Sequence, residues 1–172
     1  MEENLFDLLE RMESIIPDYS YESMKKIAET DKKIKAHLLS EMKVIKDNMF
    51  HVVQASYEIQ RDKLSEGAED VWDDITSLMN RIENSRTCNP KGGKDYCEKC
   101  MRRVERNLRD IISMDRRLVV TTGNMKGDVH TLYKMLFDEG REKSFIKNLD
   151  KIKTYVEELN TMVDEREKSI VG

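Results

Sequence analysis

Hydrophobic residues recur every three or four positions along almost the whole chain, which is the spacing of an α-helix lying against a core. The first run covers residues 3–16 and stops at Pro17, so a short helix is expected within residues 1–20. No stretch shows the useful length of strict alternation that is typical of a β-strand. The pattern therefore predicts an all-α fold.

The longest run covers residues 21–65, in which neither glycine nor proline occurs. A helix of about 40 residues would be roughly 60 Å long. Asp31 occupies one position of its apolar stripe, where it either faces a basic partner or marks an open stretch. The stripe otherwise consists of Met24, Ile27, Ile34, Leu38, Met42, Ile45, Met49, Val52 and Ile59.

Three further helical segments follow, over residues 68–86, 97–122 and 128–170, and Gly140 is expected to divide the third into two helices. Gly67 is expected to end the long helix, a turn is expected over 87–96, and Gly123 and Gly127 indicate a loop. Asp115 and Arg166 interrupt the apolar stripes of the second and third segments. The last segment has the most regular heptad pattern in the chain, at Phe145, Leu149, Ile152, Val156, Leu159 and Val163.

Three long apolar stripes require burial, and the simplest solution is a single domain, residues 1–172, folded as an elongated antiparallel helical bundle with coiled-coil-like packing. The long helix is expected to extend beyond its partners. Pairing with a second copy would cover its remaining stripe, so the sequence predicts a homodimer.

Composition narrows the function classes. Charged residues make up 37% of the chain, aromatic residues 6%, and the formal net charge is -4. This balance argues against coating nucleic acid or an anionic membrane by bulk charge. No apolar run approaches the roughly 20 residues that span a bilayer, and the first residues lack the pattern of a secretory signal. The expected location is cytoplasmic, with no membrane partner.

All three cysteines, Cys88, Cys97 and Cys100, lie in one short segment with the spacing Cys-x8-Cys-x2-Cys. Zinc takes four tetrahedral ligands, and His130 is the expected fourth. A disulfide across the turn, with Cys88 bonded to Cys97, would instead join two helix ends. Reduced thiols in the core, an iron–sulfur cluster and a redox site are the remaining interpretations.

The helix after this turn carries a basic face made of Lys99, Arg102, Arg103, Arg106, Arg109 and Arg117. Steps of three and four place these residues on one side of a helix, and guanidinium groups suit phosphate or carboxylate ligands. Glu98, Glu105 and Asp110 are interleaved with them, and no aromatic residue is placed for base stacking. Acidic helices of the same chain are the competing explanation for the face.

The sequence favours a non-enzymatic interaction or scaffold protein that self-associates or binds partner helices, with a metal- or disulfide-clamped corner. The first alternative is a nucleic-acid-associated protein that uses the basic face. The second is a thiol- or metal-dependent enzyme, for which no general base occurs at a recognised spacing.

Overall fold

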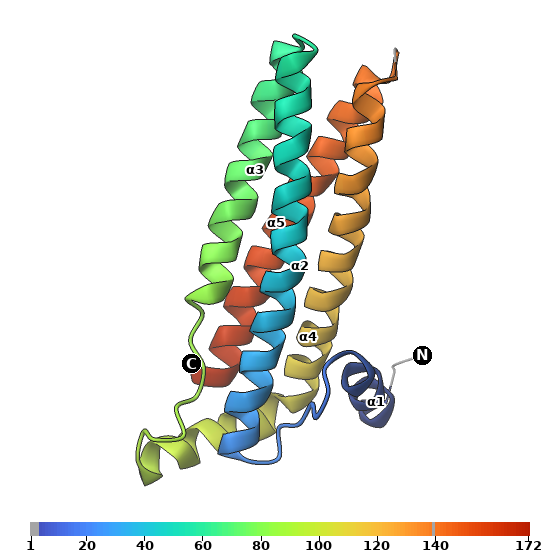
Figure 1. Ribbon diagram of the computed structural model, residues 1–172. Helices are drawn as coiled ribbons and strands as arrows, with labels where there is room; N and C mark the ends of the chain where they lie inside the picture. The colour runs from blue at the N-terminus through green and yellow to red at the C-terminus, as the bar shows by residue number, and fades with distance from the viewer. Residues whose placement is uncertain (1–3, 139) are drawn as a thin grey trace.

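A computed structural model describes residues 4–138 and 140–172 and contains five helices within them (Figure 1). These are α1 (Leu5–Ile15), α2 (Met24–Glu58), α3 (Asp62–Glu83), α4 (Lys94–Leu136) and α5 (Glu142–Val171). No strand occurs in the described ranges. The all-α fold is confirmed, as is one helix of about 40 residues, but that helix is α4 with 43 residues rather than α2 with 35.

The four long helices form an up-down-up-down bundle (Figure 1). Helix α2 packs against α3 and α4, and α5 packs against the same two, so α3 and α4 stand at opposite corners. The two hairpins, α2 with α3 and α4 with α5, are antiparallel. A linker over residues 84–93 crosses the lower end from α3 to α4, and α1 packs beside α4 there.

The predicted apolar stripes form one continuous core. From Ile27 to Val52 the apolar stripe positions of α2 are at most 2% exposed, and those of α5 from Phe145 to Val163 are also buried. The partners of α2 cover its stripe because α4 is the longer helix. The homodimer was predicted because part of the apolar stripe of α2 was expected to remain uncovered. In the described chain this stripe is covered, so self-association stays a prediction without that support.

The turn between α2 and α3 lies at residues 59–61, not at Gly67 as expected. Gln60 adopts a left-handed conformation with φ of 57°. Its N–H donates to the carbonyl of Tyr57, and the N–H of Arg61 donates to that of Ser56, which is the usual hydrogen-bond pattern at a helix end. Glycine normally occupies this position, so a glutamine there does not indicate a turn. Gly67 lies inside α3 instead.

The predicted loop at Gly123 and Gly127 is wrong, because α4 passes through both residues without a break. A glycine inside a helix costs about 1 kcal/mol relative to alanine. Each buried Leu or Val side chain contributes roughly 1.5–3 kcal/mol, so the stripe outweighs the two glycines. The stripe continues through Leu118, Thr122, Met125, Val129, Leu132 and Leu136.

The helices of the described residues are amphipathic. Among the described residues, no helix combines sufficient length with an apolar stretch that could cross a bilayer.

Candidate functional site: the base of the bundle

Most of the chemistry singled out in the sequence gathers at the lower end of the bundle in Figure 1, which we call the base. The base consists of α1, the segment 16–23, the first three turns of α2, the linker 84–93, α4 up to Asp115 and α5 from Asp164 onward. Three separate stretches of chain meet there: α1 through the start of α2, the linker with the first part of α4, and the end of α5. The upper half contains the remaining parts of the four long helices and two short turns.

A disulfide joins Cys88 in the linker to Cys100 in the second turn of α4. Their Cα atoms are 6.3 Å apart, and both sulfur atoms lie 3.6 Å from the carbonyl oxygen of Ile170 near the end of α5. The disulfide alternative is therefore present, but the expected partner Cys97 is wrong. Cys100 is buried and faces the core next to Val104, whereas Cys97 lies on the half-exposed side of α4.

The predicted zinc ligands do not gather. The Cys97 thiol faces the carbonyls of Asn89 and Pro90, at 3.9 and 3.6 Å. His130 is exposed and lies on the same continuous helix as Cys100, roughly 45 Å of helix away. Within the described ranges no three His, Cys, Asp or Glu side chains are grouped as a metal site. Zinc stays a prediction that would require a reduced Cys88–Cys100 pair and a fourth ligand other than His130.

The three charged residues that interrupt the apolar stripes are partners of one another. Arg166 of α5 donates from Nη1 to Asp31 of α2 at 2.5 Å and from Nε to Asp115 of α4. All three are at most 6% exposed. Burial alone would lower the pKa of Arg166, but the two carboxylates outweigh it and hold that pKa well above its ordinary value. The guanidinium is therefore always charged, and it binds three helices together.

Two tyrosines of the segment 16–23 complete this cluster. The hydroxyls of Tyr19 and Tyr21 both donate to Oδ2 of Asp115 at 2.6 Å, and Arg166 donates to the Tyr21 oxygen at 3.0 Å. Burial raises the pKa of both phenols, so they remain protonated donors. The cluster therefore fixes the segment 16–23, and with it α1, to the core of the bundle.

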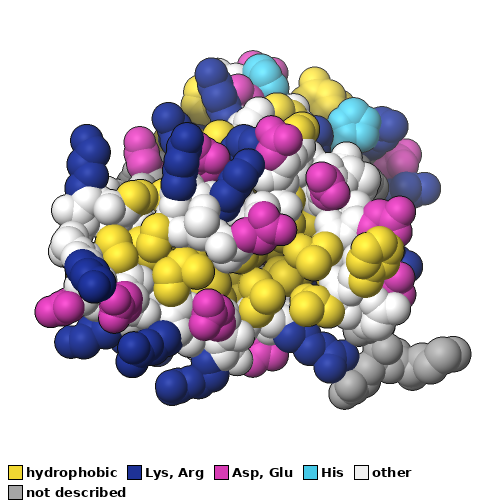
Figure 2. Space-filling model, turned by 90° about the horizontal axis from the view of Figure 1, so that it is seen from below, with side chains coloured by type: hydrophobic (Ala, Val, Ile, Leu, Met, Phe, Trp, Pro, Cys, Tyr) yellow, Lys and Arg dark blue, Asp and Glu magenta, His cyan; other side chains and the backbone are white. Residues whose placement is uncertain are grey.

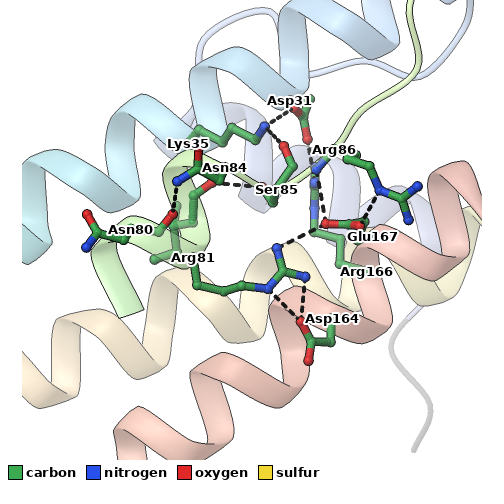
Figure 3. A network of polar contacts seen from close by, with 11 residues as sticks. Asp31, Lys35, Asn80, Arg81, Asn84, Ser85, Arg86, Asp164, Arg166 and Glu167 are labelled. Atoms are coloured by element: carbon green, nitrogen blue, oxygen red, sulfur yellow. Dashed lines mark hydrogen bonds and ion pairs between the residues drawn. The ribbon is translucent and has the colours of Figure 1, made fainter. Parts of the chain in front are cut away.

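A second, more exposed network adjoins the first at Asp31 (Figure 3). Lys35 lies 3.4 Å from Asp31 and donates to the carbonyl of Ser85 in the linker. Glu167 accepts from the backbone N–H and side chain of Arg86, at 3.0 and 2.7 Å, and from Arg81 at 3.1 Å. Burial alone would raise the pKa of Glu167, but these donors lower it to about 2. The network holds the linker against α2 and α5.

An open groove lies beside this rigid core, between α1, the segment 16–23 and the first part of α4. Its volume is about 730 Å³. Phe6 and Leu9 of α1 line one wall, and Met101 and Leu108 of α4 line the other. Phe6 is 72% exposed, and the other three are half-buried. Figure 2 shows hydrophobic side chains gathered in the middle of this end of the molecule, with charged side chains around them.

The predicted basic face also belongs largely to the base. Lys99, Arg102, Arg106, Arg109 and Arg117 are exposed, and Arg103 is half-buried with its guanidinium against Gly172. Arg102 lies 3.8 Å from Glu98 one turn away. Arg109 and Arg117 line a separate hollow of about 410 Å³ together with Leu8 and Arg116. The face therefore exists as expected, and whether it binds nucleic acid stays a prediction.

The groove was not predicted, because Met101, Val104, Leu108 and Ile111 follow one another at helical spacing and indicate a single buried stripe over residues 97–122. In the structure the buried side of this part of α4 carries Cys100, Val104 and Ile111, about a fifth of a turn away. The apolar residues of this part of α4 form two adjacent stripes, and a second stripe on one helix could have indicated a binding surface. The stripe of Met101 and Leu108 is the one that lines the groove.

Comparison of the chain with models of protein families, with curated protein sequences and with solved structures gave no match in any of the three. The function must therefore be argued from the base itself.

Proposed function

We propose that this protein is a non-enzymatic helical scaffold that binds a partner polypeptide in the groove at its base. One observation carries the proposal. Met101 and Leu108 continue an apolar stripe of α4 but are only half-buried, and they face a hollow of about 730 Å³ with Phe6 on its other wall. Apolar stripes of this kind are covered elsewhere in the bundle, and contiguous apolar surface that remains open commonly marks a binding site.

The groove is suited to a helix. Its walls are themselves helices, and a helix that enters such a groove inserts side chains spaced three and four residues apart. Phe6 resembles the exposed aromatic anchors that dominate binding energies at interfaces. We place the predicted partner-helix interaction here and not along α2, because the stripe of α2 is already covered by α3 and α4.

The experiment is a selection of random peptides against the whole protein, which assumes nothing about the partner's charge. Peptides enriched on the wild type are then measured against Phe6→Glu and against Phe137→Glu. Phe137 is 58% exposed and lies at the opposite end of the bundle, so it is a matched control. We expect binding to be lost in Phe6→Glu and kept in Phe137→Glu. If no enriched peptide depends on Phe6, the proposed function is wrong.

The nucleic-acid alternative has its own support in the exposed guanidinium groups of Arg102, Arg106 and Arg109 on one side of α4. Phosphate binding through them predicts an affinity that falls steeply with salt and that is lost when Arg102, Arg103 and Arg106 are changed to alanine. A duplex or single strand whose binding is unaffected by both changes would remove this alternative. The cytoplasmic location, and the second alternative of a thiol- or metal-dependent enzyme, stay predictions.

A further inference from the structure

We infer that the occupant of the groove is a basic amphipathic helix of a partner protein. This inference rests on the proposed function and adds the chemistry of the partner. It begins with the rim, where carboxylates greatly outnumber cations. The rim residues are Glu10, Glu13, Asp18, Glu22, Glu105 and Lys26.

Four of the five rim carboxylates have no partner among the described residues. Asp18 pairs with Lys33 at 3.2 Å. Glu10, Glu13, Glu22 and Glu105 are exposed, and no ion pair or hydrogen bond with another described side chain engages their carboxylates. A helix that carries lysine or arginine beside its apolar stripe would place its cations against these four groups while its apolar side chains enter the groove. Charge of opposite sign around an apolar centre sets both the partner and its orientation.

The chain's own basic face is a poor occupant, which argues against a second copy. The exposed side of α4 around Arg102 and Arg106 has arginine and glutamate neighbours and presents no exposed apolar stripe. It would meet the acidic rim but leave Phe6 and Leu9 uncovered. The groove needs apolar and basic side chains on one helix, whereas the exposed large hydrophobic residues of α4, which are Tyr96, Val120 and Tyr133, lie outside the stretch that carries Arg102 and Arg106.

The walls of the groove are fixed before a partner arrives. Tyr19 and Tyr21 line the groove with their rings, and their hydroxyls are held by the buried carboxylate of Asp115. The disulfide of Cys100 fastens the turn of α4 that carries Met101. A preformed site loses less conformational freedom on binding, so a short helix suffices for measurable affinity.

Three labelled helical peptides of about 14 residues, roughly 21 Å long, provide the test. The first combines a leucine stripe with lysine, the second replaces lysine with glutamate, and the third keeps lysine but replaces leucine with glutamine. Binding to the whole protein is measured by fluorescence anisotropy at low and high salt. We expect the first to bind at least about tenfold more tightly than either of the others, and to weaken as salt screens the charges.

Two variants separate local charge from net charge. The triple variant Glu10→Gln, Glu13→Gln, Glu22→Gln should weaken binding of the first peptide about tenfold. The variant Asp70→Asn, Asp73→Asn, Asp74→Asn removes the same charge from exposed positions of α3 and should leave binding unchanged. Phe6→Ala should weaken the first peptide at constant charge.

The outcomes distinguish this inference from the proposed function. Tighter binding of the glutamate peptide, still lost in Phe6→Ala, would overturn the basic partner and leave the groove as a binding site. Equal effects of the two triple variants would also overturn it, because bulk charge would then explain the attraction. A dimer in sedimentation that dissociates in Phe6→Ala would make a second copy the occupant. If neither these peptides nor selected ones depend on Phe6, the proposed function itself fails.

Discussion

The two ends of this bundle are stabilised in different ways. In the upper half, aliphatic side chains such as Ile45, Val129 and Ile152 fill the interior, and each hairpin closes through a short turn. In the base, Asp31, Asp115 and Arg166 form a charged cluster in the core, and a disulfide fastens the linker. These three are the charged residues that are buried in the described ranges.

The two kinds of core differ in how strictly they determine the register in which the helices pack. Aliphatic stripes pack well in several registers, because one leucine replaces another after a shift of one heptad. An ion pair inside the core is satisfied in one register only, and any shift leaves a charge buried without a partner. The base also has to hold three separate stretches of chain, the first of which begins with the short helix α1. We therefore regard the base as the end that fixes the arrangement, and the upper half as the larger source of apolar burial.

The largest expected effect comes from Arg166→Met. It leaves Asp115 buried without a cation and Asp31 with Lys35 alone, and we expect the free energy of unfolding to fall by about 3–5 kcal/mol in denaturant titration. The control, Ile152→Val, trims one methyl group from the same helix in the upper half and should cost about 1 kcal/mol. Equal losses in the two variants would remove the contrast between the ends.

Removing the disulfide is the next test of the base. The double variant Cys88→Ser, Cys100→Ser should lower the free energy of unfolding by about 3 kcal/mol, because the unfolded chain gains the freedom of a loop that the bond closes over 12 residues. A reducing agent should bring the wild type to the same value. Cys97→Ser is the control and should change little. A large effect of Cys97→Ser would indicate a different pairing in solution.

Acid should weaken the base through Glu167. Its pKa of about 2 lies below the ordinary 4.5, so the folded state gains stability above pH 4.5 that is lost progressively as the pH falls through 2. Glu167→Gln should cost roughly 1–3 kcal/mol at pH 7 and flatten the dependence between pH 4.5 and 2. Glu157→Gln, an exposed position of α5, is the control. Identical pH profiles for the wild type and Glu167→Gln would contradict the role of this network.

The smallest effects belong to the upper half and have the opposite sign. Gly123 and Gly127 have open space where a Cβ would lie, so Gly123→Ala and Gly127→Ala should each stabilise by about 0.5–1 kcal/mol in thermal unfolding. Gly140→Ala should destabilise instead, because Gly140 has a φ of 91°. Destabilisation by the first two substitutions would mean that α4 is interrupted there after all.

Part of the buried cluster could have been predicted. Asp31, Asp115 and Arg166 each stand where the helical period calls for an apolar residue. One cation and two carboxylates at such positions indicate a shared buried site, since a lone buried charge is costly. The tyrosines could not be assigned, because Tyr19 lies between the first two predicted helices and Tyr21 was expected at the start of the long helix, which begins only at Met24. The disulfide between Cys88 and Cys100 could not be predicted either, because sequence spacing alone does not distinguish Cys97 from Cys100 as the partner of Cys88.

The sequence by itself determined that the chain is helical and which side of most helices is buried, because both follow from a local period of three to four residues. It did not determine where α2 ends or that α4 continues, because Gln60 in a left-handed turn and two glycines inside a helix are decided by packing. Only the tertiary structure decided which charges meet and which apolar side chains remain uncovered. Both depend on contacts between residues as far apart as Asp31 and Arg166, about which local spacing carries no information.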